Sequence, residues 1–173
     1  MPEPNCSTIA ARTGVGEDRA HGAVMPPLYL SSNYTFDGYQ GKRQYDYTRS
    51  GNPTRDVTAE AISKLEGGFG AVLTSSGMAA LDLLTYALRP GDLLLAPHDC
   101  YGGTHRLLRS KAERGYFRLK LVNQTDPAAL EAAFAEEPPR LILVETPSNP
   151  LLRVTDLALV ARLCRAHGTL FAA

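Results

Sequence analysis

Short apolar runs alternate with helical segments over most of this chain, and this alternation constrains the fold more than any other feature of the sequence. The runs expected to form strands are residues 71–74, 93–96, 117–122, 141–144 and 169–173. Apolar runs that are mostly continuous are typical of parallel strands covered on both faces. The sequence therefore predicts an α/β fold: an open, mostly parallel sheet with helices on both faces and right-handed crossovers.

The segments between these runs carry helical spacing and helix end signals. Pro53 suits a first helical turn, and a glycine pair at residues 67–68 ends the same helix. Further helices are expected from the Ser75–Met78 turn to the Pro90–Gly91 pair, through Leu107 and Leu108, from Asp126 to about Ala135, and from Thr155–Asp156 to Gly168.

The first 52 residues show no sustained period. Pro26 and Pro27 impose an extended path there. The segment also holds six aromatic side chains: Tyr29, Tyr34, Phe36, Tyr39, Tyr45 and Tyr47. We interpret residues 1–52 as an ordered arm that packs on another surface, such as a second subunit. The alternative is a frayed terminus. Residues 53–173 are interpreted as the first part of a larger domain.

Composition excludes several classes of function. Eighteen basic side chains balance eighteen acidic ones, which argues against nucleic-acid binding. No apolar run approaches the roughly 20 residues of a membrane span, and the N-terminus does not resemble a signal peptide. Three cysteines without a CxxC pair fit a reducing cytoplasm, and the four histidines share no metal-binding spacing.

Three polar loops follow the expected strands: SSGMA, PHDCYGGTH and ETPSNP. Ligands of open α/β sheets bind beyond the carboxyl ends of the strands, so these loops are expected to form one site. The Ser75–Met78 turn opens a helix and is interpreted either as a phosphate cradle or as an ordinary capped turn. It is neither GxGxxG nor a Walker A loop, which disfavours a Rossmann-type nucleotide binder.

Two side chains in the other loops are candidates for ligand contact. Tyr101 has the shape to stack on a planar ligand and a hydroxyl that can move protons; a surface position is the alternative. Asn149 is a candidate amide donor, with an Asx-type turn as the alternative. Bracing of the loop is the role considered for Glu145. A His98–Asp99 dyad is disfavoured because side chains of sequence neighbours rarely meet in the required geometry. Cys100 is interpreted as a buried filler.

Five segments then resemble a known family in the same order and spacing: YDYTRSGNPT (Tyr45 to Thr54), LEGG (Leu65 to Gly68), SSGMAA (Ser75 to Ala80), HDCYGGTHRL (His98 to Leu107) and ETPSNPLLRV (Glu145 to Val154). Together they resemble the Cys/Met-metabolism enzymes that depend on pyridoxal 5′-phosphate (PLP), from about Thr8 to the last residue. The resemblance implies the large domain of a type I PLP-dependent transferase, as in aspartate aminotransferase.

The resemblance also implies roles for single residues around the cofactor. The backbone amides of Gly77 and Met78 would hold the phosphate. Tyr101 would stack on the pyridine ring and assist proton transfer. Asn149 would bond the ring's 3′ oxygen.

Four further positions are implied to act at the cofactor phosphate or the substrate. Tyr47 and Arg49 would reach the phosphate of a neighbouring subunit, which gives the arm a purpose. Asp46 and Arg106 would lie near the substrate, with Arg106 at its distal carboxylate. The assembly implied is a homotetramer of tight dimers.

The implied reaction is a γ-replacement that makes L-cystathionine from an O-acylhomoserine, expected to be O-succinyl-L-homoserine, and L-cysteine. Sister activities of the family stay open: homoserine sulfhydrylase, cystathionine lyase and methionine γ-lyase. Ser50 stands where some family members carry a second arginine, which leaves the choice among them open.

Two residues that the family pattern requires are not found in the chain. One is an aspartate after the fifth strand that holds the pyridinium nitrogen, and the other is a lysine that forms a Schiff base with the cofactor. The lysines present are Lys42, Lys64, Lys111 and Lys120, and none has the expected context. We therefore expect an N-terminal fragment that is inactive alone, with a non-catalytic truncated product as the alternative.

Overall fold

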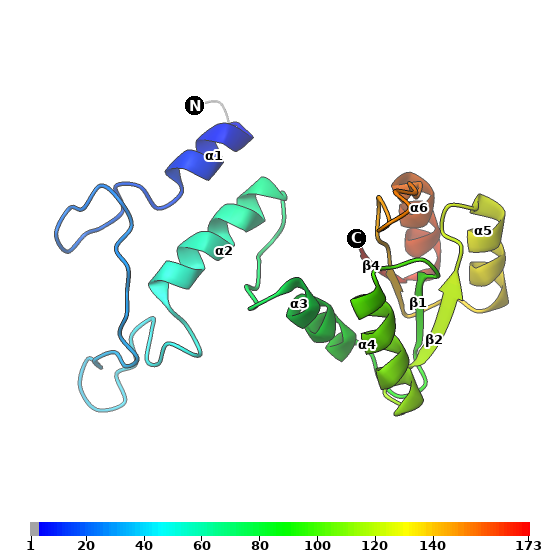
Figure 1. The fold of residues 1–173 in the computed structure, drawn as a ribbon. Coiled ribbons are helices and arrows are strands. Elements are labelled where there is room, and N and C mark those ends of the chain that lie inside the picture. Colours follow the sequence, from blue (N-terminus) through cyan, green and yellow to red (C-terminus); the bar gives the residue numbers. More distant parts are fainter. Residues whose placement is uncertain (1–3) are drawn as a thin grey trace. The chain divides into compact units, whose positions relative to one another are not determined.

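The computed structural model describes residues 4–173. Contacts divide the chain into two compact units, one ending at Thr74 and the other spanning Ser75–Ala173. The first unit contains helices α1 (Cys6–Arg12) and α2 (Pro53–Leu65), joined by a long irregular segment (Figure 1). The second unit contains the sheet.

The second unit runs through alternating helices and strands in this order: α3 (Gly77–Leu84), the 3₁₀ turn η1 (Thr85–Ala87), β1 (Leu93–Pro97), α4 (Gly102–Glu113), β2 (Arg118–Val122), α5 (Pro127–Glu136), β3 (Leu141–Leu143), α6 (Leu157–His167) and β4 (Leu170–Ala172). All strand pairs are parallel, in the order β2-β1-β3-β4. The predicted α/β class and parallel sheet are confirmed.

Side chains on the two faces of the sheet form two separate apolar cores. On one face, Leu95 and Ile142 pack with residues of α5 and α6, including Phe134 and Val160. On the other face, the neighbouring positions of β1 and β3 pack with Leu108 of α4 and with residues of α3. Figure 1 shows α4 on one side of β1 and β2, and the α5–α6 pair on the other. Burial on both faces explains why the central strands β1 and β3 are continuously apolar.

Helix ends follow the signals read in the sequence. Asp126 accepts hydrogen bonds from two amides in the first turn of α5, and Asp156 does the same for α6. Gly168 ends α6 in the left-handed conformation, at φ 65°. In α2, Asn52 is the N-cap and Pro53 the first residue.

One local expectation was wrong. Residues 71–74 form no strand, and Val72 is 76% exposed. Strands form by hydrogen bonding to neighbouring strands, and the sheet of the described residues consists of β2, β1, β3 and β4 without this segment. The arm contains a helix, α1, which begins after the capping side chain of Asn5.

Buried polar contacts order the irregular part of the first unit. Asn52 is only 8% exposed, and its side-chain nitrogen donates to the carbonyl of Tyr29 at 3.0 Å and to Thr48 Oγ1 at 2.6 Å. The hydroxyl of Thr54 accepts a hydrogen bond from the Tyr29 amide at 2.9 Å. The start of α2 therefore holds two distant stretches of the arm.

Among the described residues, no helix is both long enough and apolar enough to cross a bilayer.

Candidate active site

The predicted phosphate cradle lies at the start of α3. The hydroxyl of Ser76 caps the helix by accepting from the Ala79 amide at 3.1 Å. The N–H groups of Gly77 and Met78 occupy the first two helical positions, where no carbonyl partner exists inside the helix. A Cβ placed on Gly77 would meet no heavy atom of the described chain within 4 Å. Two amides and open space at a positive helix end therefore fit an anion such as a phosphate.

The ring of Tyr101 and the side chain of Met78 both lie near Gly103. Tyr101 follows the loop after β1 and directly precedes α4. A Cβ built on Gly103 would lie 2.5 Å from Tyr101 Cε1 and 3.1 Å from Met78 Sδ. The ring of Tyr101 and the side chain of Met78 thus both occupy the space that a side chain at position 103 would fill. The tyrosine remains 50% exposed, which leaves ring surface for a ligand.

Glu145 joins the Tyr101 loop to the Asn149 loop. The amide N–H of Tyr101 donates to Glu145 Oε2 at 3.0 Å, and the amide N–H of Asn149 donates to Glu145 Oε1 at 3.2 Å. The side chain of Asn149 is exposed. The three polar loops read from the sequence are therefore connected: Met78 to Tyr101 through Gly103, and Tyr101 to Asn149 through Glu145.

A second bridge holds the loop that carries Asn149. Ser148 is 2% exposed, and its hydroxyl donates to Asp99 Oδ2 at 3.0 Å. The same hydroxyl accepts from the Arg153 amide at 3.3 Å. His98 Nδ1 lies nearer the Val122 carbonyl, at 3.3 Å, than Asp99 Oδ1, at 3.7 Å.

Cys100 is buried between these loops. Burial, followed by the nearby charge of Glu145, raises the pKa of the Cys100 thiol. The thiol therefore stays protonated near neutral pH, as expected for a buried filler rather than a nucleophile.

Tyr47 and Arg49, the two arm residues expected at a phosphate, lie in the first unit. The Arg49 guanidinium carbon lies 5.1 Å from the centre of the Tyr47 ring. Arg49 and Arg55 also line one cavity of about 350 Å³. Two guanidinium side chains beside an open cavity are suited to an anion, because guanidinium groups bind phosphate oxygens in pairs.

The two residues expected near the substrate, Asp46 and Arg106, belong to different units. Asp46 lies within the arm loop, where Lys42 is its ion-pair partner at 2.9 Å and its Oδ1 accepts from the Tyr47 amide and the Ser50 hydroxyl. These contacts, led by the one from Lys42, lower the pKa of Asp46 to about 2. Arg106 lies exposed on α4, and its Nη1 is 3.4 Å from the Cβ position of Gly102.

All four lysines of the chain are held in ion pairs. The acidic partners are Asp46 for Lys42, Glu60 for Lys64, Asp82 for Lys111 and Glu136 for Lys120. None of these lysines belongs to the loops of Met78, Tyr101 or Asn149.

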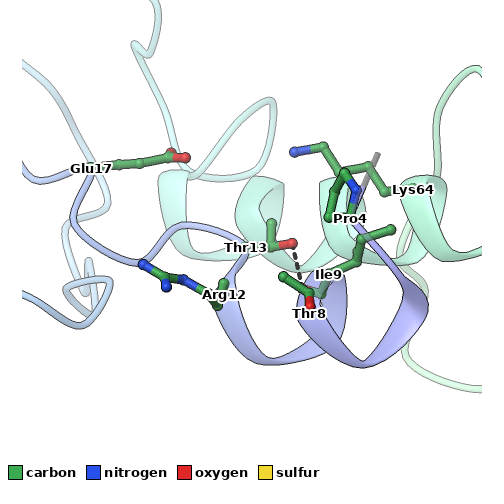
Figure 2. A pocket seen from close by; sticks show the side chains of 7 residues that line it. All are labelled: Pro4, Thr8, Ile9, Arg12, Thr13, Glu17 and Lys64. Carbon is green, nitrogen blue, oxygen red and sulfur yellow. Dashed lines mark hydrogen bonds between the residues drawn. The ribbon is translucent and has the colours of Figure 1, made fainter. Parts of the chain in front are cut away.

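One of the larger cavities lies between α1 and α2 and measures about 480 Å³ (Figure 2). Ile9, Arg12 and Lys64 are among the residues that line it. None of the candidate site residues lines it, so it forms no part of the candidate site. Within residues 4–173, no group of three or more His, Cys, Asp and Glu side chains is arranged to hold a metal ion.

The structural roles of Gly103 and Ser148 were not identified from the sequence. The sequence also did not predict that the Glu145 carboxylate accepts hydrogen bonds from two loops. The glycine pair directly after Tyr101 was a usable signal for Gly103, because a tyrosine ring needs free space beside it. The contacts of Glu145 and Ser148 join residues that are 44 and 49 positions apart, so no local pattern records them.

Comparison with known proteins gives one consistent family. The family model described as Cys/Met metabolism PLP-dependent enzyme matches residues 7–173. Cystathionine γ-synthase of Escherichia coli (strain K12) is 55% identical over 163 residues, covering 94% of this chain and 42% of that protein. A cystathionine β-lyase of Lactococcus lactis subsp. cremoris (strain MG1363) is 38% identical, over 91% of this chain and 41% of the lyase.

A solved structure agrees with these sequence matches. The structure of cystathionine γ-synthase from Xanthomonas oryzae pv. oryzae in complex with cystathionine has a TM-score of 0.95 and 52% identity to this chain. The match covers 98% of this chain and 44% of that one. The chain thus spans less than half the length of these relatives.

Proposed function

Because the chain belongs to the family of Cys/Met-metabolism PLP-dependent enzymes, we propose that the full-length protein makes L-cystathionine from an O-acylhomoserine, with O-succinyl-L-homoserine as the expected ester, and L-cysteine. In this γ-replacement the bond between Cγ and the ester oxygen breaks, and the acyl group leaves as a carboxylate. A bond forms between Cγ and the cysteine sulfur, and the thiol proton is released. The identity to cystathionine γ-synthases of two bacteria supports this choice.

One structural observation carries the proposal: the loops of Met78, Tyr101 and Asn149 are linked at one site through Gly103 and Glu145. A planar, phosphate-bearing cofactor needs a phosphate-binding group, a stacking surface and a polar donor that lie no farther apart than the cofactor is long. The start of α3, the half-exposed ring of Tyr101 and the exposed amide of Asn149 are suited to these three roles.

PLP would be held through its phosphate by the amides of Gly77 and Met78, and through its ring by Tyr101 and Asn149. When bound, this cofactor supplies an electron sink that stabilises negative charge at the substrate carbons. The chain's own residues orient the ring, and the hydroxyl of Tyr101 moves protons at the substrate. Arg106 is proposed to bind the distal carboxylate of the ester, and Asp46 to lie at the substrate entrance.

The arm is proposed to contact a second copy of the protein, as part of a homotetramer built from tight dimers. Tyr47 and Arg49 would bind the phosphate held by the neighbouring subunit. The cavity beside Arg49 and Arg55 supports this role. A cytoplasmic location is proposed from the cysteines, since Cys6, Cys100 and Cys164 are all free thiols.

The proposal is tested with the full-length protein, PLP, O-succinyl-L-homoserine and L-cysteine, with L-cystathionine measured by mass spectrometry. We expect cystathionine to accumulate only when both amino acids are present. Formation of other products, or no turnover with any O-acylhomoserine, would contradict the proposed reaction.

A sister activity is the second candidate, favoured by the 38% identity to a lactococcal cystathionine β-lyase. A lyase consumes cystathionine and needs no cysteine. Incubation of the same protein with L-cystathionine alone therefore separates the two, because a γ-synthase is expected to leave most of it intact. Sulfide in place of cysteine tests for a homoserine sulfhydrylase, and L-methionine alone tests for a methionine γ-lyase.

The 173-residue chain alone is not expected to turn over substrate, since none of its four lysines has the sequence context of a Schiff-base lysine. Borohydride reduction in the presence of PLP, followed by peptide mapping, checks this. A stoichiometric lysine adduct with turnover would contradict it.

A further inference from the structure

We propose that Glu145 is a positioning residue whose carboxylate sets the spacing between the Tyr101 ring and the Asn149 amide, and so the width of the cofactor site. The inference rests on the proposed function, because it assigns those two residues to the cofactor. Its structural part, a carboxylate shared by two loops, stands on the contacts of this chain alone.

The base of Glu145 is fixed by the sheet. The preceding residue, Val144, is 3% exposed and donates its amide to the carbonyl of Ala172 at 2.8 Å. The buried side chain of Gln124 donates to the carbonyl of Leu143 at 2.8 Å. Glu145 therefore directly follows a buried residue held in the sheet and extends into the loop.

Both carboxylate oxygens of Glu145 are used, and each accepts from a different loop. Tyr101 occupies the N-cap position of α4, but its side chain makes no capping bond there. The carboxylate thus supplies negative charge at the start of a twelve-residue helix, where the helix dipole favours it. Hydrogen bonds to a charged acceptor are roughly twice as strong as neutral ones.

The positions of Tyr101 and Asn149 both depend on the side chain of Glu145. The backbone of Tyr101 is held by Glu145, and its ring is held against Gly103 and Met78. The backbone of Asn149 is held by the other oxygen. Catalysis is sensitive to such spacing, because a misplacement of about 1 Å can cost about a hundredfold in rate.

The loop has a second anchor, which makes the test feasible. Ser148 remains bonded to Asp99 when Glu145 is changed, so the loop keeps its fold while it loses its alignment. The isosteric variant Glu145→Gln keeps one acceptor oxygen but turns an NH₂ group toward one of the two amides. The matched control is Glu131→Gln, at an exposed position of α5.

The experiment compares wild type, Glu145→Gln and Glu131→Gln in the full-length protein by hydrogen–deuterium exchange at the amides of Tyr101 and Asn149. We expect exchange at one or both amides to become at least about tenfold faster in Glu145→Gln only, as loss of a charge-assisted hydrogen bond predicts. Tyrosine fluorescence quenching by PLP should give a dissociation constant raised about tenfold. The value of kcat should fall about tenfold while KM stays within about threefold.

Each outcome decides the proposal. Unchanged hydrogen–deuterium exchange at both amides in Glu145→Gln overturns the proposal that the Glu145 carboxylate holds the two loops. Faster exchange with unchanged PLP affinity and kcat also overturns the proposal, because Glu145 would then only brace the loop. If wild-type protein binds no PLP, the proposed function and the cofactor role of Glu145 are both contradicted. The exchange rates at the Tyr101 and Asn149 amides still decide whether the Glu145 carboxylate joins the two loops.

Discussion

The ring of Tyr101 lies so close to Gly103 that a Cβ at position 103 would be 2.5 Å from Tyr101 Cε1. A contact this short requires one of the two groups to move. The tyrosine is half exposed, so its ring can turn toward solvent, whereas the backbone of α4 is held by its helical hydrogen bonds. Gly103 therefore determines where the ring lies.

The variant Gly103→Ala tests this relationship. We expect the free energy of unfolding to change by less than about 1 kcal/mol, because alanine favours the helix and the ring can move away. PLP affinity of the full-length protein should fall about tenfold, since the stacking surface is displaced. Gly102→Ala is the matched control, as its Cβ would meet only the flexible end of Arg106, at 3.4 Å. Equal PLP affinity in the two variants would contradict the prediction.

Asn52→Ala should destabilise the first unit by about 2 kcal/mol. The substitution removes the N-cap of α2 and the hydrogen bonds from the Asn52 side chain to Tyr29 and Thr48. Limited proteolysis between residues 28 and 50, together with urea unfolding, measures the effect. Asn5→Ala removes only the exposed cap of α1 and should cost about 1 kcal/mol or less. Similar protease sensitivity in both variants would argue against a special role for Asn52.

Lys111→Met should destabilise the second unit by about 1–2 kcal/mol. The Lys111 ammonium is 2.5 Å from Asp82 Oδ1, donates to Thr85 Oγ1 at 2.6 Å and lies 4.8 Å from the Tyr86 ring centre. Its side chain is only 19% exposed, so the contacts are partly shielded from water. Lys120→Met removes a more exposed ion pair with Glu136 and should cost less than about 0.5 kcal/mol. Thermal unfolding of both variants compares them directly.

Tyr45 should make the stability of the first unit fall at alkaline pH. Burial, and then the hydrogen bond that its hydroxyl donates to Asp56 at 2.9 Å, raise the pKa of Tyr45 to about 12. The unfolded value is about 10, so the folded state holds the proton more tightly. The stabilisation is fully present below pH 10 and is lost as pH rises toward 12. Tyr45→Phe should flatten this part of the stability–pH curve, and it should remove a late-titrating tyrosinate signal from the ultraviolet titration of wild type.

Much of the fold could be predicted because its signals are local. Asn52 and Pro53 mark the start of α2, Asp126 that of α5, and Gly168 the end of α6. Strands β1 and β3 are apolar at every position because both faces are covered. Residues 71–74 look the same in sequence, yet they form no strand, since pairing depends on neighbours that a local pattern does not record.

The candidate site could be predicted only in part. The rule that ligands lie beyond the carboxyl ends of parallel strands predicts that the loops of Tyr101 and Asn149 lie together, and the amides of both residues donate to Glu145. It could not assign Glu145 to both of them or place Met78 against Gly103, because these contacts are set by how the helices pack on the sheet. The cofactor and substrate roles of the arm residues stay predictions.

The side-chain amide of Asn52 donates to Tyr29, Tyr34 and Thr48 of the arm and accepts from the Thr54 amide, while Asn52 also begins α2. The stretch has contacts of its own, such as the Tyr34 amide with the Asp46 carbonyl, but three of its separate points meet at this one helical turn. Fraying of that turn would therefore release the segments around Tyr29 and Thr48 together, so these two parts of the arm should loosen in a single step.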